Sequence, residues 1–203
     1  MNGAGVRQSQ KAATRQRVLA AARDLFACQG YEAATVRQIA NLAGVSVGSV
    51  FTSFASKGEI LSEVMKDRLD GLYAELDRVI PHLRGSTADR LRSMFAIHFA
   101  FEQRHIQLFL AHLAAAYDWT LGPGATPYGR NRRFQELILD CLNRGVAEGD
   151  VDPGADLLGV VDLLRAAYAW TYRLAAWENA AVDQLVDAMD QQIGLIATGF
   201  RPR

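Results

Sequence analysis

Glu102 and His105 are the residues whose types and spacing first suggest metal chemistry. They form a Glu-x-x-His motif of the kind found in di-iron helical bundles, which need a second such motif and two further inward-facing Glu. The sequence has no second Glu-x-x-His. His98, His105 and His112 recur every seven residues, which places neighbours about 10 Å apart along a helix, too far to share one ion. We therefore expect no metal ion and no cofactor.

Nucleophilic catalysis has no better support in the sequence. Cys28 and Cys141 stand alone, without CxxC or CxxH spacing, and we expect both to be buried, reduced thiols. No Gly-x-Ser-x-Gly motif is present, although a Ser-His-Asp set assembled from distant segments stays open at this point. The residues favour a protein that is not an enzyme.

A run of small and hydroxylated side chains suits contact with DNA. It comprises Ser46, Val47, Gly48, Ser49, Thr52 and Ser53. Thr35, with Gln38 at the reciprocal position of a capping box, predicts the start of a short helix that ends at Gly44, and Ser46 predicts the start of the next. Gly44 can adopt the positive φ of a tight turn. Helix, turn and helix over residues 35–54 are typical of a helix-turn-helix, whose second helix enters the major groove.

The remaining sequence has helical periodicity throughout, without the alternation of a strand. We expect an all-α fold of about nine helices, over residues 18–29, 35–43, 46–54, 57–80, 87–101, 105–117, 134–145, 153–177 and 182–200. Asp152-Pro153 is typical of a helix start, and the Gly- and Pro-rich segment 121–127 predicts a loop. No apolar stretch is long enough to span a membrane and no signal sequence opens the chain. We expect a cytoplasmic protein without a membrane partner.

Charge is distributed unevenly although the chain is neutral overall. Residues 1–68 carry nine basic and five acidic side chains, so this third has a net charge of +4 and the remainder −4. A basic segment beside an acidic one is typical of a nucleic-acid-binding head on a separate body, and an uneven surface is the alternative. Residues 1–10 are expected to form a flexible arm. Arg7, Lys11, Arg15 and Arg17 would add DNA contacts from this end of the chain or belong to a solvated tail.

Residues 30–61, from Gly30 through the helix-turn-helix to Leu61, resemble the DNA-binding signature of the tetracycline-repressor (TetR) family of bacterial regulators. The resemblance implies a dimeric repressor with a three-helix N-terminal head, a linking fourth helix and a C-terminal helical bundle. That bundle would bind a small effector and dimerise through the last two helices. We expect a head at residues 1–56 and a ligand-binding and dimerisation domain at 57–203.

The resemblance also assigns DNA contacts by position. Thr35 and Lys57 match phosphate-contacting positions and Arg37 is a further candidate, while Ser46, Val47, Gly48, Ser49, Thr52 and Ser53 lie on the recognition helix. Two positions depart from the family pattern. Phe51 replaces the usual Tyr, whose hydroxyl reaches a phosphate, so Phe51 is expected to serve packing; Ser53 replaces the usual His or Tyr.

The C-terminal body offers aromatic side chains for an effector site. We expect an apolar or weakly polar, aromatic ligand to contact Phe95, His98, Phe99, Phe109, His112, Tyr117, Phe134 and Trp170, with His98 or His112 as polar anchor and segment 121–127 as gate. A filled core of packed rings is the alternative. We expect the dimer interface on Leu157, Val161, Leu164, Tyr168, Met189, Ile193 and Ile196.

Together these expectations describe a regulator that binds a palindromic, double-stranded DNA operator as a homodimer and is released by a small-molecule effector. The alternative function is an architectural or interaction protein that binds DNA through the same head without an effector.

Overall fold

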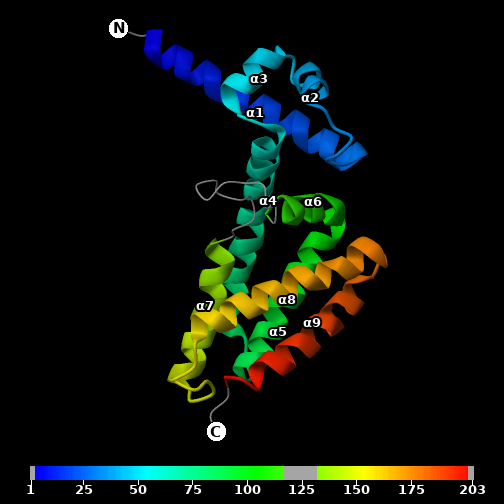
Figure 1. The fold of residues 1–203 in the computed structure, drawn as a ribbon. Coiled ribbons are helices and arrows are strands. Elements are labelled where there is room, and N and C mark those ends of the chain that lie inside the picture. The colour runs from blue at the N-terminus through cyan, green and yellow to red at the C-terminus, as the bar shows by residue number, and fades with distance from the viewer. Residues whose placement is uncertain (1–2, 117–131, 201–203) are drawn as a thin grey trace. The chain divides into compact units, whose positions relative to one another are not determined.

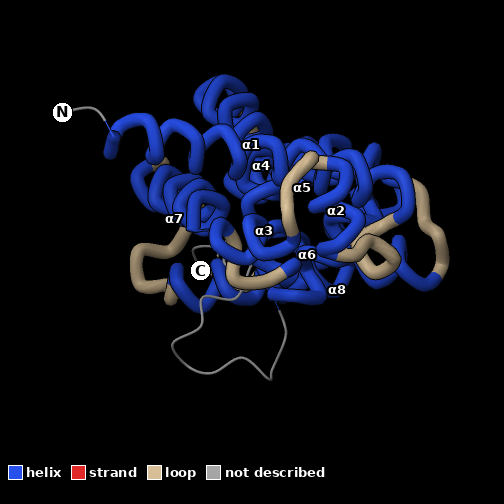
Figure 2. Tube along the Cα trace, turned by 90° about the horizontal axis from the view of Figure 1, so that it is seen from above, coloured by secondary structure: helices blue, strands red, loops and turns tan. Residues whose placement is uncertain are grey.

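The structure is a computed structural model, and it describes residues 3–116 and 132–200 (Figure 1). The α-helices are α1 (Gly3–Gln29), α2 (Val36–Leu42), α3 (Val47–Ser53), α4 (Lys57–Val79), α5 (Thr87–Glu102), α6 (Ile106–Ala116), α7 (Arg132–Ala147), α8 (Leu157–Trp177) and α9 (Val182–Ala197). Two 3-10 turns, η1 (Ile80–His82) and η2 (Gln103–His105), follow α4 and α5. Every regular element in the two described ranges is a helix (Figure 2). The expectation of an all-α chain with about nine helices is confirmed.

The chain divides into two compact units. The first comprises residues 1–69 and 107–130, and the second comprises 70–106 and 131–203. The division falls inside α4, whereas the domain boundary expected from the sequence lies at residue 56. The Gly- and Pro-rich segment 121–127, expected as a gate, lies outside the described residues.

The first unit contains the three-helix head. Its apolar core is formed by side chains spaced three and four apart on each helix: Val18, Leu19, Ala22 and Phe26 of α1, Ile39 and Ala40 of α2, and Val50 and Phe54 at α3. One expectation is corrected here. Residues 3–10, expected as a flexible arm, belong to α1, because the segment before Val18 holds no Pro and several residues with good helix propensity.

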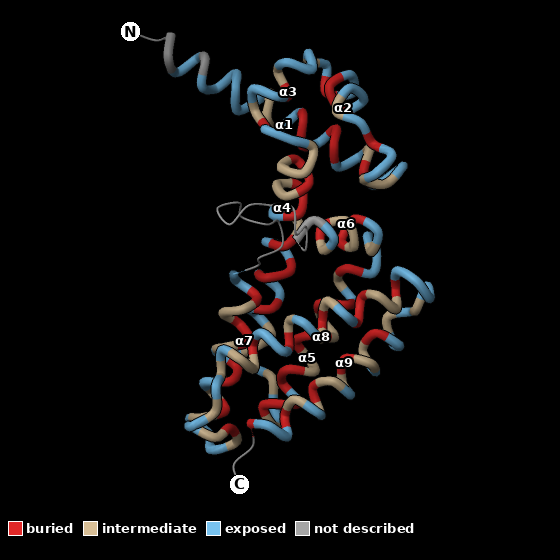
Figure 3. The backbone as a smooth tube through the Cα atoms, viewed as in Figure 1, coloured by how far each residue is buried: buried red, intermediate tan, exposed pale blue. Residues whose placement is uncertain are grey.

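The second unit is a bundle in which α5 packs against α7 and α9, and α8 packs against α7 and α9. Buried side chains follow helical spacing along each helix, for example Val161, Leu164 and Tyr168 on α8 and Leu185, Met189 and Ile193 on α9 (Figure 3). Cys141 of α7 is buried as expected, whereas Cys28 of α1 is exposed, contrary to expectation.

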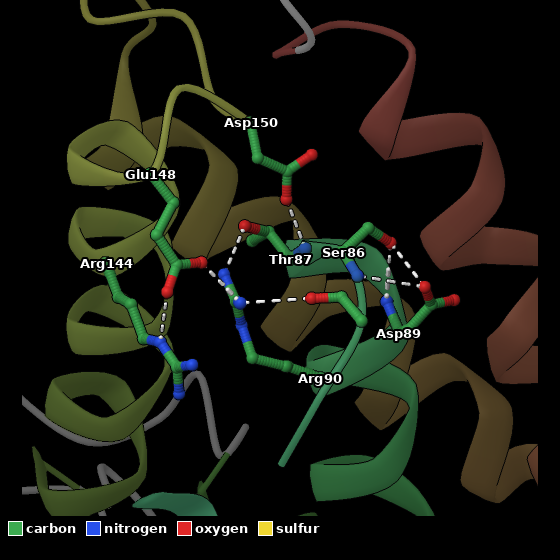
Figure 4. A network of polar contacts seen from close by, with 8 residues as sticks. Ser86, Thr87, Asp89, Arg90, Arg144, Glu148 and Asp150 are labelled. Carbon is green, nitrogen blue, oxygen red and sulfur yellow. Dashed lines mark hydrogen bonds and ion pairs between the residues drawn. The ribbon is translucent and has the colours of Figure 1, made fainter.

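Buried Arg90 links the start of α5 to the end of α7 through hydrogen bonds (Figure 4). Arg90 is only 3% exposed. Its Nη1 lies 3.1 Å from the Gly85 carbonyl and 2.6 Å from the Glu148 carboxylate, and its Nη2 donates to Thr87 Oγ1 at 2.9 Å. The Thr87 amide donates to Asp150. Because a buried charge must be paired, this network fixes α5 and α7 relative to each other.

Helix α5 begins at residue 87 as expected, and its N-cap is Ser86: Ser86 Oγ accepts from the Asp89 amide and Asp89 accepts from the Ser86 amide. The expected helix start at Asp152-Pro153 is wrong, because the Asp152 carboxylate accepts from Gly154 N at 2.8 Å in a turn. Asp156 caps α8 instead, accepting from Gly159 N at 3.0 Å.

Candidate DNA-binding head and aromatic core

The second helix of the helix-turn-helix, α3, is held by the cap that the sequence predicted. Ser46 Oγ accepts from Ser49 N at 3.1 Å, and the two hydroxyls lie 2.8 Å apart. Gly44 has a φ of +63° in the turn, as expected. Ser46, Val47, Gly48 and Thr52 are exposed and Ser49 is half-buried. These five residues are available to a partner.

The chemistry of α3 is that of short hydroxyls and methyl groups. Thr52 Oγ1 donates to the Gly48 carbonyl at 2.9 Å, so its remaining capacity is to accept. A hydroxyl can accept from the amino group of cytosine or adenine, and the methyl groups of Val47 and Thr52 suit the thymine methyl. No Arg, Lys, Asn or Gln occurs in α3, so a bidentate contact to guanine or adenine would have to come from elsewhere in the chain.

Two of the expected positions lie at the start of α2. Thr35 is the N-cap of α2, and both halves of its capping box with Gln38 are formed. Its side chain is exposed beside the first turn of α2, where free backbone N–H groups favour an anion. Arg37 lies in that turn and is exposed. Both side chains are therefore accessible to a partner at the start of α2.

Lys57 is engaged within the head. Its Nζ donates to the carbonyls of Tyr31, Glu32 and Ala34 at 2.9, 3.4 and 3.2 Å, and it lies 4.2 Å from the centre of the Tyr31 ring. The ammonium thus ties the first turn of α4 to the chain entering α2. A phosphate contact by Lys57 would compete with these bonds.

Phe51 and Ser53 are placed differently from their expected roles. Phe51 was expected to serve packing, but its side chain is 53% exposed on α3, because Val50 and Phe54 occupy the inward face. The Ser53 side-chain oxygen is buried, without a hydrogen-bond partner among the described residues. Ser53 therefore does not share the exposed face of the other expected recognition-helix residues.

Four expected ligand residues come together in the second unit: Phe95, His98 and Phe99 of α5 and Phe134 of α7. The ring centres of His98 and Phe134 lie 4.6 Å apart, and those of Phe95 and Phe134 lie 5.2 Å apart. Tyr168 and Tyr172 of α8 complete this aromatic core, with Tyr168 5.1 Å from His98 and 5.3 Å from Phe99 between ring centres. The sequence analysis missed Tyr172 and assigned Tyr168 to a dimer interface, although both lie on the apolar α8 side that carries Leu164.

A chain of buried polar groups runs through the aromatic core. The Tyr168 hydroxyl is hydrogen-bonded to His98 Nδ1 and donates to the Tyr172 hydroxyl at 3.2 Å. Burial lowers the pKa of His98 to about 3, so its ring is neutral, and burial raises the pKa of Tyr168. The core therefore holds neutral hydrogen-bonding groups among aromatic rings.

Glu102 is a further buried residue that sequence reasoning did not place here. It is 0% exposed at the end of α5, and its charge contributes to the raised pKa of Tyr168. The Glu-x-x-His spacing drew attention to it for another reason. Among the described residues, no group of three or more His, Cys, Asp or Glu could hold a metal ion.

The other described ligand residues that the sequence predicted belong to the first unit or are exposed. Phe109 and His112 are buried on α6, in the first unit, with ring centres 6.2 Å apart. Burial lowers the pKa of His112 to about 4. Trp170 is 56% exposed on α8, and the Arg173 guanidinium lies 3.3 Å from its ring centre. Tyr117 lies outside the described residues.

The stripe expected at the dimer interface is largely core. Val161, Leu164, Tyr168, Met189 and Ile193 are at most 6% exposed within one protomer, while Leu157 and Ile196 are half-buried. The interface expected from the five buried residues is corrected, because their surface is already covered by the protomer's own helices. The exposed large apolar side chains of α8 and α9 are Leu158, Leu163, Trp170, Trp177 and Leu195.

No described helix is long and apolar enough to cross a membrane.

Comparison with known proteins gives a family match over the N-terminal head. A family model described as "Bacterial regulatory proteins, tetR family" matches residues 18–64. The chain is 33% identical over 150 residues to the HTH-type transcriptional repressor KstR2 of Mycolicibacterium smegmatis, covering 73% of each protein. It is 26% identical to the solved ketosteroid transcriptional regulator KstR2 of Mycobacterium tuberculosis, with a TM-score of 0.56 over 93% of this chain and 95% of that one.

The fold is also shared with more distant structures. Thermus thermophilus FadR, a TetR family repressor solved in complex with lauroyl-CoA, has a TM-score of 0.73 at 22% identity, over 93% of this chain and 96% of that one. The family match covers the capped helix-turn-helix, and the KstR2 likeness extends beyond it. The chain belongs to the TetR family of bacterial regulatory proteins and is a DNA-binding transcriptional regulator.

Proposed function

We propose that the chain is a homodimeric repressor that binds a palindromic operator and leaves it when a neutral, apolar or aromatic small molecule binds in the aromatic core of the second unit. The observation that carries the effector assignment is the hydrogen-bonded set His98, Tyr168 and Tyr172, enclosed by aromatic rings. Residues 1–56 act as the head and 57–203 as the effector-binding and dimerisation domain. The activity belongs in the cytoplasm, where the DNA is.

The charges of the core favour a neutral ligand. His98 is kept neutral by burial, and the buried Glu102 contributes negative charge to this region. Because the His98 ring carries no charge, it offers no ion pair to an anionic ligand, whereas a ligand carbonyl or hydroxyl can replace one hydrogen bond of the Tyr168 hydroxyl. The aromatic rings supply flat contact surface for a polycyclic or aryl skeleton.

The relatives' names are compatible with such a ligand. One solved relative is called a ketosteroid regulator, and a ketosteroid is a neutral polycyclic molecule with a carbonyl group. The FadR structure contains lauroyl-CoA, whose phosphates are anionic. The core of this chain favours the first ligand chemistry.

On the DNA side, we propose that Thr35 and Arg37 contact phosphates and that Ser46, Val47, Gly48, Ser49 and Thr52 face the bases. Lys57 contributes a phosphate contact only by giving up part of its carbonyl network. Contacts to phosphates set affinity and its salt dependence, and contacts to base edges set sequence preference.

For dimerisation, we propose the exposed apolar face of α8 and α9. Leu163, Trp170 and Trp177 are 58%, 56% and 74% exposed on α8, and Leu195 is 71% exposed on α9. Large apolar side chains gathered on one surface are typical of a protein interface. In a two-fold dimer each protomer would contribute the same face.

The response of DNA binding to an effector distinguishes this proposal from an architectural protein that binds DNA through the same head. The first step is to select a preferred duplex from a random library with the full chain. Its affinity is then measured by fluorescence anisotropy, with and without a neutral ketosteroid and with lauroyl-CoA as the anionic comparison. We expect the ketosteroid to weaken DNA binding by about 5- to 150-fold, the usual range of allosteric coupling, and lauroyl-CoA to have a smaller effect.

A single variant tests whether the ketosteroid releases DNA by binding in the aromatic core. Tyr168→Phe removes the hydroxyl and keeps the ring, so DNA affinity should be unchanged while release by the ketosteroid is reduced. DNA binding that is indifferent to both ligands would favour the architectural alternative.

A further inference from the structure

Arg15, in the middle of α1, joins three parts of the head. Its Nη1 donates to the Ser53 carbonyl at 2.8 Å, and its Nη2 lies 2.9 Å from Glu63 Oε2 on α4. Its guanidinium carbon lies 4.2 Å from the centre of the Phe54 ring. All four residues belong to the first unit. The side chain thus contacts the C-terminal end of α3 and the body of α4 together.

The contacts match the properties of a guanidinium. Ser53 is the last residue of α3, where unpaired carbonyls carry partial negative charge and favour a cation. The planar fork of Arg can serve a carbonyl and a carboxylate simultaneously and stack on an aromatic ring, which the single ammonium of Lys cannot do. Phe54 is 2% exposed beneath it, so the guanidinium also covers an apolar ring.

We propose that Arg15 is a positioning residue for the recognition helix: it fixes the C-terminal end of α3 against α4 and thereby sets the angle at which α3 meets the bases. The alternative is a direct contact from Arg15 to a DNA phosphate. In that case the phosphate would have to approach the exposed part of the Arg15 side chain, which is 32% exposed, beside the negative charge of Glu63. The inference rests on base contacts by α3, a part of the proposed function.

The first test compares two duplexes of equal length: the sequence selected by the wild-type chain and a shuffled sequence of the same composition. Arg15→Met should weaken binding to the selected duplex by about tenfold or more, the scale of a lost base contact. Binding to the shuffled duplex should fall no more than in Arg17→Met, which removes the same charge from an exposed position on α1. The slope of log affinity against log salt should equal that of the wild type.

A phosphate contact and a purely structural role give different results. Loss of a phosphate contact would weaken both duplexes alike and flatten the salt slope by about one. Loss of head stability alone would also weaken both duplexes alike, in proportion to the unfolded fraction measured by circular dichroism. Either outcome overturns the positioning role.

The second test asks whether Glu63→Gln weakens or strengthens DNA binding. Glu63→Gln removes a negative charge from the head, so a direct electrostatic effect or a released Arg15 would strengthen DNA binding. The positioning role instead predicts weaker binding to the selected duplex, because Arg15 loses its anchor on α4. Asp24→Asn, an exposed position of the same charge change on α1, serves as control and should not weaken binding. Stronger binding in Glu63→Gln would overturn the inference.

The conservative variant gives an independent check should Arg15→Met not fold. Arg15→Lys keeps the positive charge, so it should restore a phosphate contact but not the simultaneous contacts to Ser53 and Glu63. Recovery of wild-type specificity in Arg15→Lys would contradict the inference. If the wild-type chain enriches no sequence, the proposed repressor function fails instead. The positioning of α3 by Arg15 is then tested by amide hydrogen exchange in the free chain. Faster exchange of the α3 amides in Arg15→Lys than in the wild type supports the positioning role, and unchanged exchange overturns it.

Discussion

Gly145 of α7 lies where a side chain has no room, and Gly145→Ala therefore tests the packing of α5 against α7. A Cβ atom at this position would lie 2.1 Å from Thr87 Oγ1 and 2.6 Å from Val151 Cγ2. Thr87 and Val151 are 1% and 0% exposed, so neither can move into solvent. The added methyl group must displace buried atoms at the start of the helix that carries Phe95 and His98.

The expected free-energy change combines opposing contributions. Replacing Gly by Ala inside a helix stabilises by about 1 kcal/mol, whereas overpacking a filled core costs about 1–3 kcal/mol. Moving Thr87 also disturbs its 2.9 Å hydrogen bond from Arg90, a further cost of about 1 kcal/mol. We expect Gly145→Ala to lower the free energy of unfolding by about 1–3 kcal/mol.

Gly71→Ala is the matched control. Gly71 lies inside α4, is exposed, and has no atom within 4 Å of an added Cβ. Only the helix-propensity gain remains, so this variant should be more stable than the wild type by about 0.5–1 kcal/mol.

Urea unfolding followed by circular dichroism at one fixed protein concentration measures both variants, because association would otherwise shift the midpoint. In the background Thr87→Ala, which removes one of the two obstructing groups, Gly145→Ala should be less destabilising than in the wild type. The packing argument is refuted if Gly145→Ala is as stable as the wild type while Gly71→Ala shows its expected gain.

Three further predictions concern assembly, DNA and pH. Trp170→Glu on the exposed α8 face should give folded monomers in analytical ultracentrifugation, whereas Leu164→Glu, at a position that is 0% exposed, should unfold the chain; a dimeric Trp170→Glu would contradict the proposed face. Replacing Ser49 and Thr52 by Ala should change the sequence selected from a random library while circular dichroism stays unchanged, and an unchanged sequence would place the base contacts elsewhere. Because burial depresses the pKa of His98 to about 3 and that of His112 to about 4, the unfolded chain binds these protons first as pH falls; stability should be complete above about pH 6.5, and below it each of the two histidines should lower stability by at most about 1.4 kcal/mol per pH unit. Urea midpoints that stay constant from pH 7 to 5, or an equal decline in His98→Asn, would argue against this assignment.

The head was predictable from the sequence because its determinants are local. The caps at Thr35 and Ser46 and the turn at Gly44 each act within a few residues, and the structure forms all three. The use of Arg15 was not predictable in the same way, since its partner Ser53 lies 38 positions away. A basic residue near a DNA-binding helix is compatible with either an internal or a DNA contact.

In the second unit, helical periodicity alone does not determine which side of a helix is buried. Helix α8 has two apolar stripes, and helical spacing cannot decide which one faces α5 and α9. The structure buries Leu164 and Tyr168 and exposes Leu163 and Trp170, so the stripe expected at the dimer interface lies in the protomer's own core. Glu102 was likewise considered only as a metal ligand, because nothing in its sequence neighbourhood predicts full burial of a carboxylate.

The most direct test of the account is the sequence that the full-length chain selects from random duplex DNA, followed by footprinting on that sequence. A homodimeric repressor with one α3 per protomer should enrich an inverted repeat and protect its two halves equally, with half-sites about one helical turn apart or a multiple of it. Enrichment of no sequence, or of a single unsymmetrical site protected on one side only, would contradict the proposed function.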